Sequence, residues 1–174
     1  MSFETGQTAI IVAVPEAGRV VDRWRQRYDR SAPLGAPAHV TVLYPFLGSS
    51  RIDDGVLERL REVFGRQPAF EVGFRRCGRF PDVLYLEPEP AGPFRSLTVE
   101  IAGRWPEAPP YGGVHDDIVP HLTVAHGVDE DTLALVERDV AARLPVRAAV
   151  TEARLLAFDG VHWATRTRFA FGRR

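Results

Sequence analysis

The sequence is poor in cysteine and contains neither lysine nor asparagine. Cys77 is the only cysteine in 174 residues, so an intrachain disulfide and a multi-cysteine zinc site are both excluded. Stable disulfides belong to oxidising compartments, and their exclusion favours a reducing, intracellular one. We therefore expect a cytoplasmic protein.

Long apolar runs are also missing. The longest one covers residues 9–14, far short of the roughly 20 residues that a membrane-spanning helix needs. Residues 1–7 do not have the basic segment followed by a long apolar core that marks a secretory signal. We expect a soluble protein without a membrane partner, and no obligate protein partner is evident.

An excess of one charge is the third absence. The 22 cationic side chains nearly balance 23 acidic ones, giving a net charge of -1, which argues against a uniformly basic coat for long nucleic acids. All 22 cations are arginine and they are spread along the whole chain, so we favour coding bias over a dedicated anion surface. Ordinary apolar (45%) and charged (26%) contents predict a globular fold, as one domain or two joined lobes.

Strand and helix patterns follow the same order in both halves of the chain. In the first half, strands are expected at residues 8–14, 38–44 and 70–77, and helices at 16–28 and from Asp53. In the second half, strands are expected at 83–87 and 120–125, helices from Pro93 and at 129–144, and a closing hairpin at 146–158 and 161–171. Asp159-Gly160 suits a two-residue turn with positive φ at both residues. This order favours an internal duplication, with halves near 1–78 and 79–174.

Two short motifs occupy equivalent strands of these halves. These tetrads are His39-Val-Thr41-Val and His121-Leu-Thr123-Val. Because side chains alternate along a strand, each imidazole shares a face with the hydroxyl about 6 to 7 Å away, while the aliphatic pair faces a core. One copy is simply a good strand sequence, but two copies related by an approximate twofold axis place two imidazoles and two hydroxyls around one cleft.

Such a cleft suits attack on phosphorus. A neutral histidine removes a proton from water or a ribose hydroxyl, and a protonated one delivers a proton to the leaving oxygen. The hydroxyls of Thr41 and Thr123 donate to the non-bridging oxygens, where charge accumulates. This scheme needs no metal or cofactor. His39 and His121 are therefore the candidate catalytic residues, with Thr41 and Thr123 as phosphate-binding residues.

At these motifs the chain resembles the 2H phosphoesterase superfamily. The stretch from His39 to Phe46 and the stretch from Pro120 to Val124 look most like its 2′-5′ RNA ligase branch. The resemblance implies a two-lobed α+β fold with pseudo-twofold symmetry, in which mainly antiparallel sheets with helices outside present the His-x-Thr strands to a central basic cleft. It also implies metal-independent hydrolysis of 2′,3′-cyclic or related phosphodiesters at an RNA terminus or in a small nucleotide, with 2′-5′ joining in some members.

One position departs from the family pattern. Members of this branch often carry arginine five residues after the second histidine, where this chain has His126. We count His126, together with Tyr44 and Phe46 beside the first motif, as candidate substrate-binding residues. The two aromatic residues are candidates for stacking on a base.

Two other functions remain open at this point. A non-catalytic RNA- or nucleotide-binding module would use the same cleft without turnover. A metallohydrolase would use the histidines and aspartates between His115 and His126, but their spacing fits no compact metal motif, and we expect no metal site.

Overall fold

The computed structural model describes residues 2–173, which form two antiparallel sheets and four α-helices. The strands are β1 (Thr8–Ala13), β2 (His39–Leu43), β3 (Phe70–Phe80), β4 (Val83–Glu89), β5 (Leu122–His126), β6 (Val146–Val150), β7 (Glu152–Phe158) and β8 (Trp163–Ala170). The helices are α1 (Gly18–Tyr28), α2 (Asp54–Arg66), α3 (Gly92–Arg104) and α4 (Glu130–Ala141). None of these helices is both long enough and apolar enough to cross a membrane.

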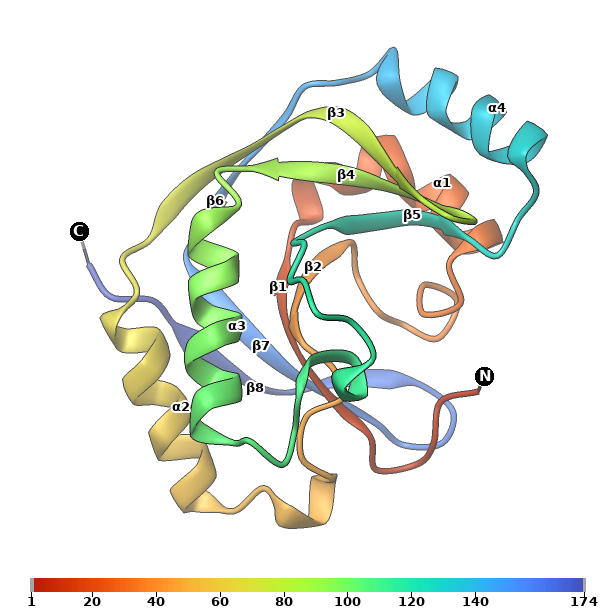
Figure 1. Cartoon of the computed structure of the whole chain (residues 1–174). Coiled ribbons are helices and arrows are strands. Elements are labelled where there is room, and N and C mark those ends of the chain that lie inside the picture. The colour runs from red at the N-terminus through yellow and green to blue at the C-terminus, as the bar shows by residue number, and fades with distance from the viewer. Residues whose placement is uncertain (1, 174) are drawn as a thin grey trace.

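Each sheet has four strands and takes them from both halves of the sequence. One runs in the order β2-β1-β7-β8 and the other in the order β5-β4-β3-β6, with antiparallel neighbours throughout. The expected two-lobed α+β fold is confirmed (Figure 1). The lobes are not the sequence halves, however, because the boundary expected at residue 78 falls inside β3.

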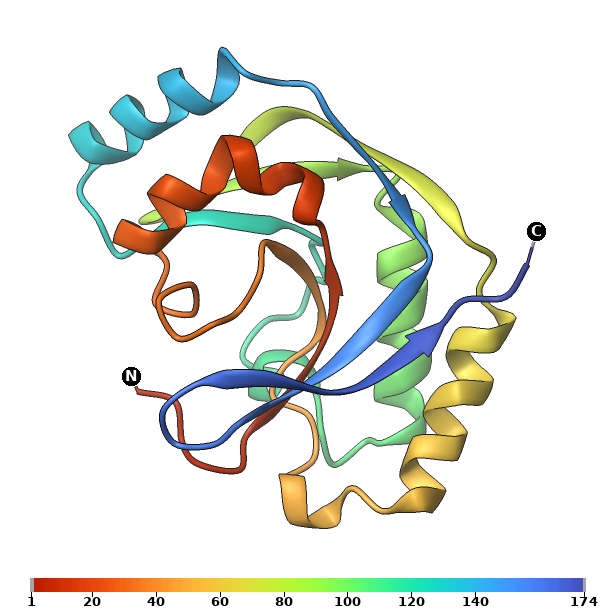
Figure 2. The same ribbon diagram turned by 180° about the vertical axis from the view of Figure 1, so that it is seen from behind.

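The helices are exchanged between the lobes. In sequence α1 joins β1 to β2, yet it packs against β5; α3 joins β4 to β5, yet it packs against β2. Figures 1 and 2 show this exchange from the two sides of the molecule. Each connecting helix covers the edge strand of the other lobe, as expected for two lobes related by a pseudo-twofold axis. The edge strands β2 and β5 contact one another across it.

The main hydrophobic core lies on the inner faces of both sheets. Val40 and Val42 of β2 are at most 2% exposed, and Leu122 and Val124 of β5 are fully buried in the same cluster. The histidine and threonine of each tetrad, on the opposite faces, are only partly buried. The alternation expected for the tetrads therefore holds, and burial of the aliphatic residues fixes which way the polar ones point.

The chain leaves one sheet for the other at Thr151, and this corrects the expected long strand at 146–158. β6 pairs with β3, whereas β7 pairs with β1 and β8. Two consecutive strands with period-two burial look like one strand in sequence, because the pattern does not record which sheet each joins.

The turn between β7 and β8 also differs from the expected one. Positive φ is found at Gly160 (102°) but not at Asp159, so the two-residue turn with both residues in that region is wrong. Asp159 Oδ1 accepts hydrogen bonds from the backbone N–H groups of Val161 and His162 at 2.8 and 2.7 Å. The aspartate side chain thus stabilises a longer loop by bonding its own backbone.

Candidate active site

Both tetrads lie on the edge strands at which the lobes meet. β2 begins at His39, and His121 directly precedes β5. Antiparallel pairing puts His39 opposite Ala13 and Thr41 opposite Ile11, on the sheet face turned away from the main core. Thr123 pairs with Tyr85 on the corresponding face of the other sheet. The structure thus brings the predicted catalytic and phosphate-binding residues to the junction of the lobes.

The two histidines are held by the same local hydrogen bond. Nδ1 of His39 is 2.6 Å from the carbonyl oxygen of Pro37, and Nδ1 of His121 is 2.7 Å from that of Val119. A carbonyl only accepts, so Nδ1 must carry the proton in both rings. Nε2 of each neutral imidazole is then left with a lone pair. It accepts a proton when the ring is neutral and donates one when the ring is protonated.

Burial keeps both imidazoles neutral over a wider pH range than in water. Desolvation, followed by the positive charge of Arg25, lowers the pKa of His39, and the charge of His121 acts in the same direction. Desolvation and then the charge of His115 lower the pKa of His121. Because protonating His121 makes His39 harder to protonate, the state with both rings charged is disfavoured, and the two rings take up protons in separate steps.

Tyr111 joins the two tetrads and was not anticipated. Its side chain is hydrogen-bonded to Thr41, and its ring lies 6.5 Å from the His121 ring at an interplanar angle of 22°. The residue comes from a turn, Pro110–Gly113, in a loop rich in proline and glycine. Such a loop carries no periodic signal, so sequence reasoning had no means of placing Tyr111 at the site.

An aromatic wall supports His121 from its own sheet. The rings of Phe80 and Tyr85 lie 5.2 and 5.4 Å from that of His121 and 4.4 Å from each other. Gly78 makes room for this arrangement, since a Cβ there would come 2.5 Å from Tyr85 ring atoms. These contacts limit the orientations open to the imidazole.

Two of the predicted substrate-binding residues differ in exposure. Phe46 is 6% exposed in the main core, edge-on to Trp105 at 5.3 Å, so it has no free face for a base. His126 is exposed at the end of β5, where Nε2 lies 4.0 Å from Oδ2 of Asp82. Phe46 lies beyond the end of β2, where strand periodicity does not reveal that the chain turns into the core.

Tyr44 is placed closer to the site, through its backbone. Its carbonyl oxygen accepts a hydrogen bond from the Tyr111 N–H at 2.7 Å. Its side chain turns to a second apolar cluster, where its ring meets those of Phe3 and Trp163 and its hydroxyl donates to Oε1 of Gln7. Tyr44 therefore anchors the loop that carries Tyr111.

Two arginines of β3 are paired with glutamates. Arg79 bonds Glu130 and Glu137 of α4, and Arg76 bonds Glu87 on the neighbouring strand. Within residues 2–173, the recorded hydrogen bonds and ion pairs include none between an arginine and a tetrad side chain.

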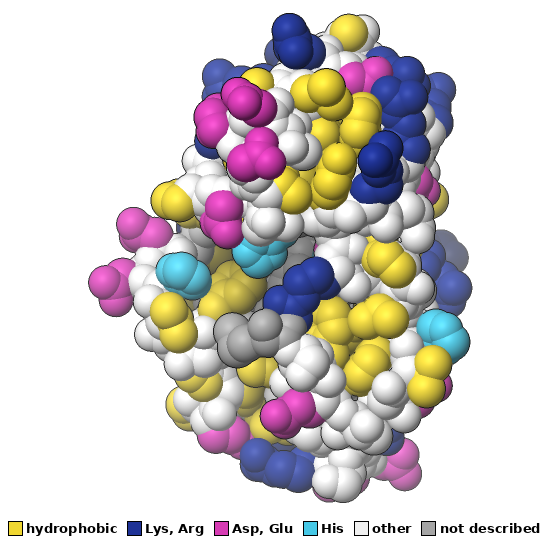
Figure 3. Space-filling model, turned by 90° about the vertical axis from the view of Figure 1, so that its right-hand side faces the viewer, with side chains coloured by type: hydrophobic (Ala, Val, Ile, Leu, Met, Phe, Trp, Pro, Cys, Tyr) yellow, Lys and Arg dark blue, Asp and Glu magenta, His cyan; other side chains and the backbone are white. Residues whose placement is uncertain are grey.

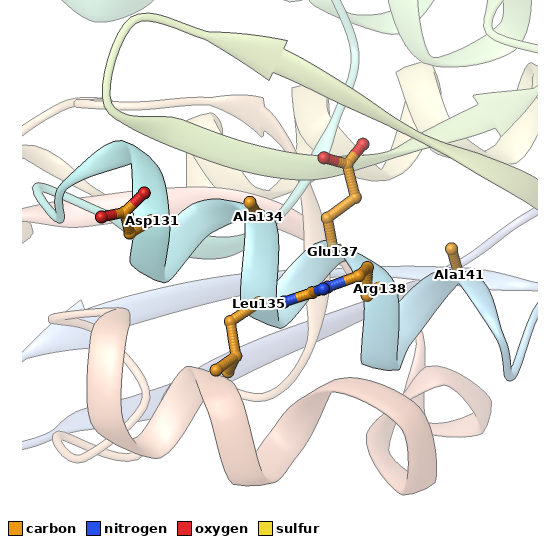
Figure 4. A pocket seen from close by; sticks show the side chains of 6 residues that line it. All are labelled: Asp131, Ala134, Leu135, Glu137, Arg138 and Ala141. Carbon is orange, nitrogen blue, oxygen red and sulfur yellow. The ribbon is translucent and has the colours of Figure 1, made fainter.

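Hollows elsewhere on the surface take no part in this site. One runs along α4 and is lined by residues of that helix only, among them Leu135 and Arg138 (Figure 4).

Figure 3 shows a different face, on which histidine side chains lie beside a hollow between the upper and lower parts of the molecule. In the described part of the chain, no three His, Cys, Asp or Glu side chains gather closely enough to hold a metal ion.

Comparison with known proteins agrees with this geometry. The profile described as "2'-5' RNA ligase superfamily" matches residues 13–162. The chain belongs to this superfamily. A protein of Staphylococcus aureus (strain Newman) named "Putative phosphoesterase" is 29% identical over 143 residues, which cover 80% of this chain and 82% of that protein.

Solved structures share the superfamily fold. Escherichia coli LigT complexed with NADP+ aligns over 98% of this chain and all of its own, with a TM-score of 0.59 and 20% identity. TT0787 of Thermus thermophilus aligns over 97% of this chain and 99% of its own, with a TM-score of 0.58 and 19% identity. The resemblance seen in the two tetrads is confirmed, and membership supports a phosphoesterase or ligase role.

Proposed function

We propose that this superfamily member is a metal-independent phosphoesterase that hydrolyses 2′,3′-cyclic or related phosphodiesters of RNA ends or small nucleotides. The observation that carries the proposal is the pair of histidines at the lobe junction. Both are held through Nδ1, so each leaves Nε2 available for proton transfer. Solved structures of E. coli LigT with 3′-AMP and with ATP support a nucleotide as the kind of ligand.

The proposed reaction is an in-line displacement at phosphorus. One histidine takes a proton from water as its oxygen bonds to phosphorus. The other gives a proton to the ribose oxygen as the P–O ester bond breaks, which yields a phosphomonoester and a free hydroxyl. Thr41 and Thr123 donate hydrogen bonds to the non-bridging oxygens. The reverse sequence, with a ribose hydroxyl in place of water, is 2′-5′ joining.

The test is turnover of 2′,3′-cyclic nucleotides and of RNA ends bearing a cyclic phosphate, in the presence of EDTA. We expect activity in EDTA and a loss of about 10²- to 10⁴-fold in His39→Ala and in His121→Ala, the range that proton transfer contributes. His162→Ala is the matched control, because His162 is exposed in the β7–β8 loop. Full activity in either tetrad variant contradicts the mechanism. Salt-dependent binding without turnover on any phosphodiester indicates instead a non-catalytic binding module.

The pH profile tests the paired roles. A bell-shaped kcat/KM reports the acid and the base of the free enzyme. Because burial lowers the pKa of both histidines, the maximum should lie below about pH 6.5, the ordinary pKa of histidine. A rate that rises steadily through about pH 8 would show that no protonated histidine is needed.

A further inference from the structure

Tyr111 is held in place from three directions. Its backbone N–H donates to the carbonyl of Tyr44 just beyond β2, its side chain is hydrogen-bonded to Thr41, and its ring faces His121. The residue has φ of 52°, a left-handed conformation that costs a non-glycine residue free energy. The surrounding contacts hold it there, so the ring and hydroxyl of Tyr111 have a defined position between the tetrads.

An anion at this site needs hydrogen-bond donors. A phosphodiester carries its charge on two non-bridging oxygens, and His126, at the end of β5, has Nε2 4.0 Å from Oδ2 of Asp82. Arg25, whose charge reaches His39, is 2% exposed and is bonded to Asp29 and to a backbone carbonyl. Tyr111 supplies a hydroxyl beside Thr41.

We propose that Tyr111 is a substrate-contacting residue whose hydroxyl donates a third hydrogen bond, beside those of Thr41 and Thr123, to the phosphate group. This rests on the proposed function. Thr41 is a hydrogen-bond partner of the phenol in the free protein, so the two hydroxyls lie next to each other. An arriving phosphate oxygen accepts from both, and each hydroxyl exchanges its neutral partner for a charged one.

The phenol stays a donor throughout the working pH range. Burial raises the pKa of Tyr111 to about 12, against the opposing effect of the hydrogen bond with Thr41. The hydroxyl therefore remains protonated at every pH at which the histidines titrate. A neutral donor also spares the nearby imidazoles a further fall in pKa, which an arginine in the same place would cause.

Tyr111→Phe tests the proposal because it removes the hydroxyl and keeps the ring. We expect kcat/KM for a 2′,3′-cyclic nucleotide to fall about 10- to 100-fold, the loss of one hydrogen bond to a charged group. Tyr28→Phe is the matched control, since Tyr28 lies on α1 and stacks on Trp24. The thermal midpoint of both variants should stay close to that of the native protein.

A titration with inorganic phosphate, followed by ³¹P NMR, separates this proposal from the proposed function. We expect Tyr111→Phe to weaken phosphate binding by a similar factor even if no phosphodiester is turned over. Failure of the native protein to hydrolyse any cyclic ester counts against the proposed function alone. Unchanged phosphate affinity in Tyr111→Phe overturns the role of Tyr111. Tighter binding or faster turnover also overturns it, because the hydroxyl would then be competing with phosphate for Thr41.

Discussion

Arg25 is a buried cation whose removal should destabilise the fold and loosen the loop before His39. Its side chain is 2% exposed, and Nε and Nη2 each lie 3.0 Å from Oδ2 of Asp29. Nη2 also donates to the carbonyl of Ala36 at 3.1 Å, and the other oxygen of Asp29 accepts from the N–H and hydroxyl of Ser31. One ion pair therefore organises the segment that leads to β2.

The change to make is Arg25→Met, which keeps much of the length of the side chain and removes its charge. Asp29, only 11% exposed at its side chain, then keeps a buried charge without its cation, and Ala36 loses a donor. Breaking a buried pair from one side costs about 3 to 5 kcal/mol, whereas removing both charges costs much less. We expect that loss in the free energy of unfolding, with partial recovery in Arg25→Met/Asp29→Asn.

Denaturation by guanidinium, followed by circular dichroism, measures the effect. Arg19→Met is the matched control, because Arg19 lies on the same helix outside the buried ion pair and surface substitutions stay within about 0.5 kcal/mol. A loss below about 1 kcal/mol in Arg25→Met would show that Asp29 is already solvated without its partner. If Arg25→Met/Asp29→Asn is less stable than Arg25→Met, the loss of stability does not come from an unpaired Asp29 carboxylate, and the reasoning is refuted.

Two further predictions concern His39 and His121. Burial lowers the pKa of His39 and His121 in the folded protein, so the unfolded chain binds more protons below about pH 6.5 and stability should fall as the pH is lowered. Urea denaturation at several pH values should show that the free energy of unfolding changes by up to about 1.4 kcal/mol per pH unit for each histidine. This dependence on pH should be weaker in His39→Gln. If it is unchanged, the pKa of His39 is not lowered in the folded protein. Gly78→Ala puts a methyl group against the Tyr85 ring and should cost about 1 to 3 kcal/mol of stability while lowering turnover through displacement of His121. Full activity in Gly78→Ala would show that the aromatic wall does not orient the imidazole.

Local sequence was enough for most of the elements and for the faces of the tetrads. His39-Val-Thr-Val and His121-Leu-Thr-Val alternate, and alternation assigns faces without knowledge of the partner strand. Helix starts were equally local: the side chains of Asp53 and Asp129 accept from backbone N–H groups three residues on, at 2.8 Å in both cases.

Local sequence patterns could not predict how distant segments pair. Thr151 separates two strands that belong to different sheets, and only their partners, β3 and β1, distinguish them. The lobes likewise draw strands from both halves, so the boundary expected at residue 78 does not divide them. We predicted that Phe46 stacks on a base because it follows the first tetrad, but contact with Trp105 places it in the core.

The sequence by itself determined which polar side chains share a strand face, because residue type and a period of two are local properties. The tertiary structure decided that the two faces meet. Packing of α1 on β5 and of α3 on β2 brings two edge strands, whose histidines are 82 residues apart in sequence, into contact. It also decided that Tyr111, from a loop with no pattern of its own, lies against Thr41 and His121. A non-local contact depends on how buried surfaces fit together, and no window of neighbouring residues contains that information.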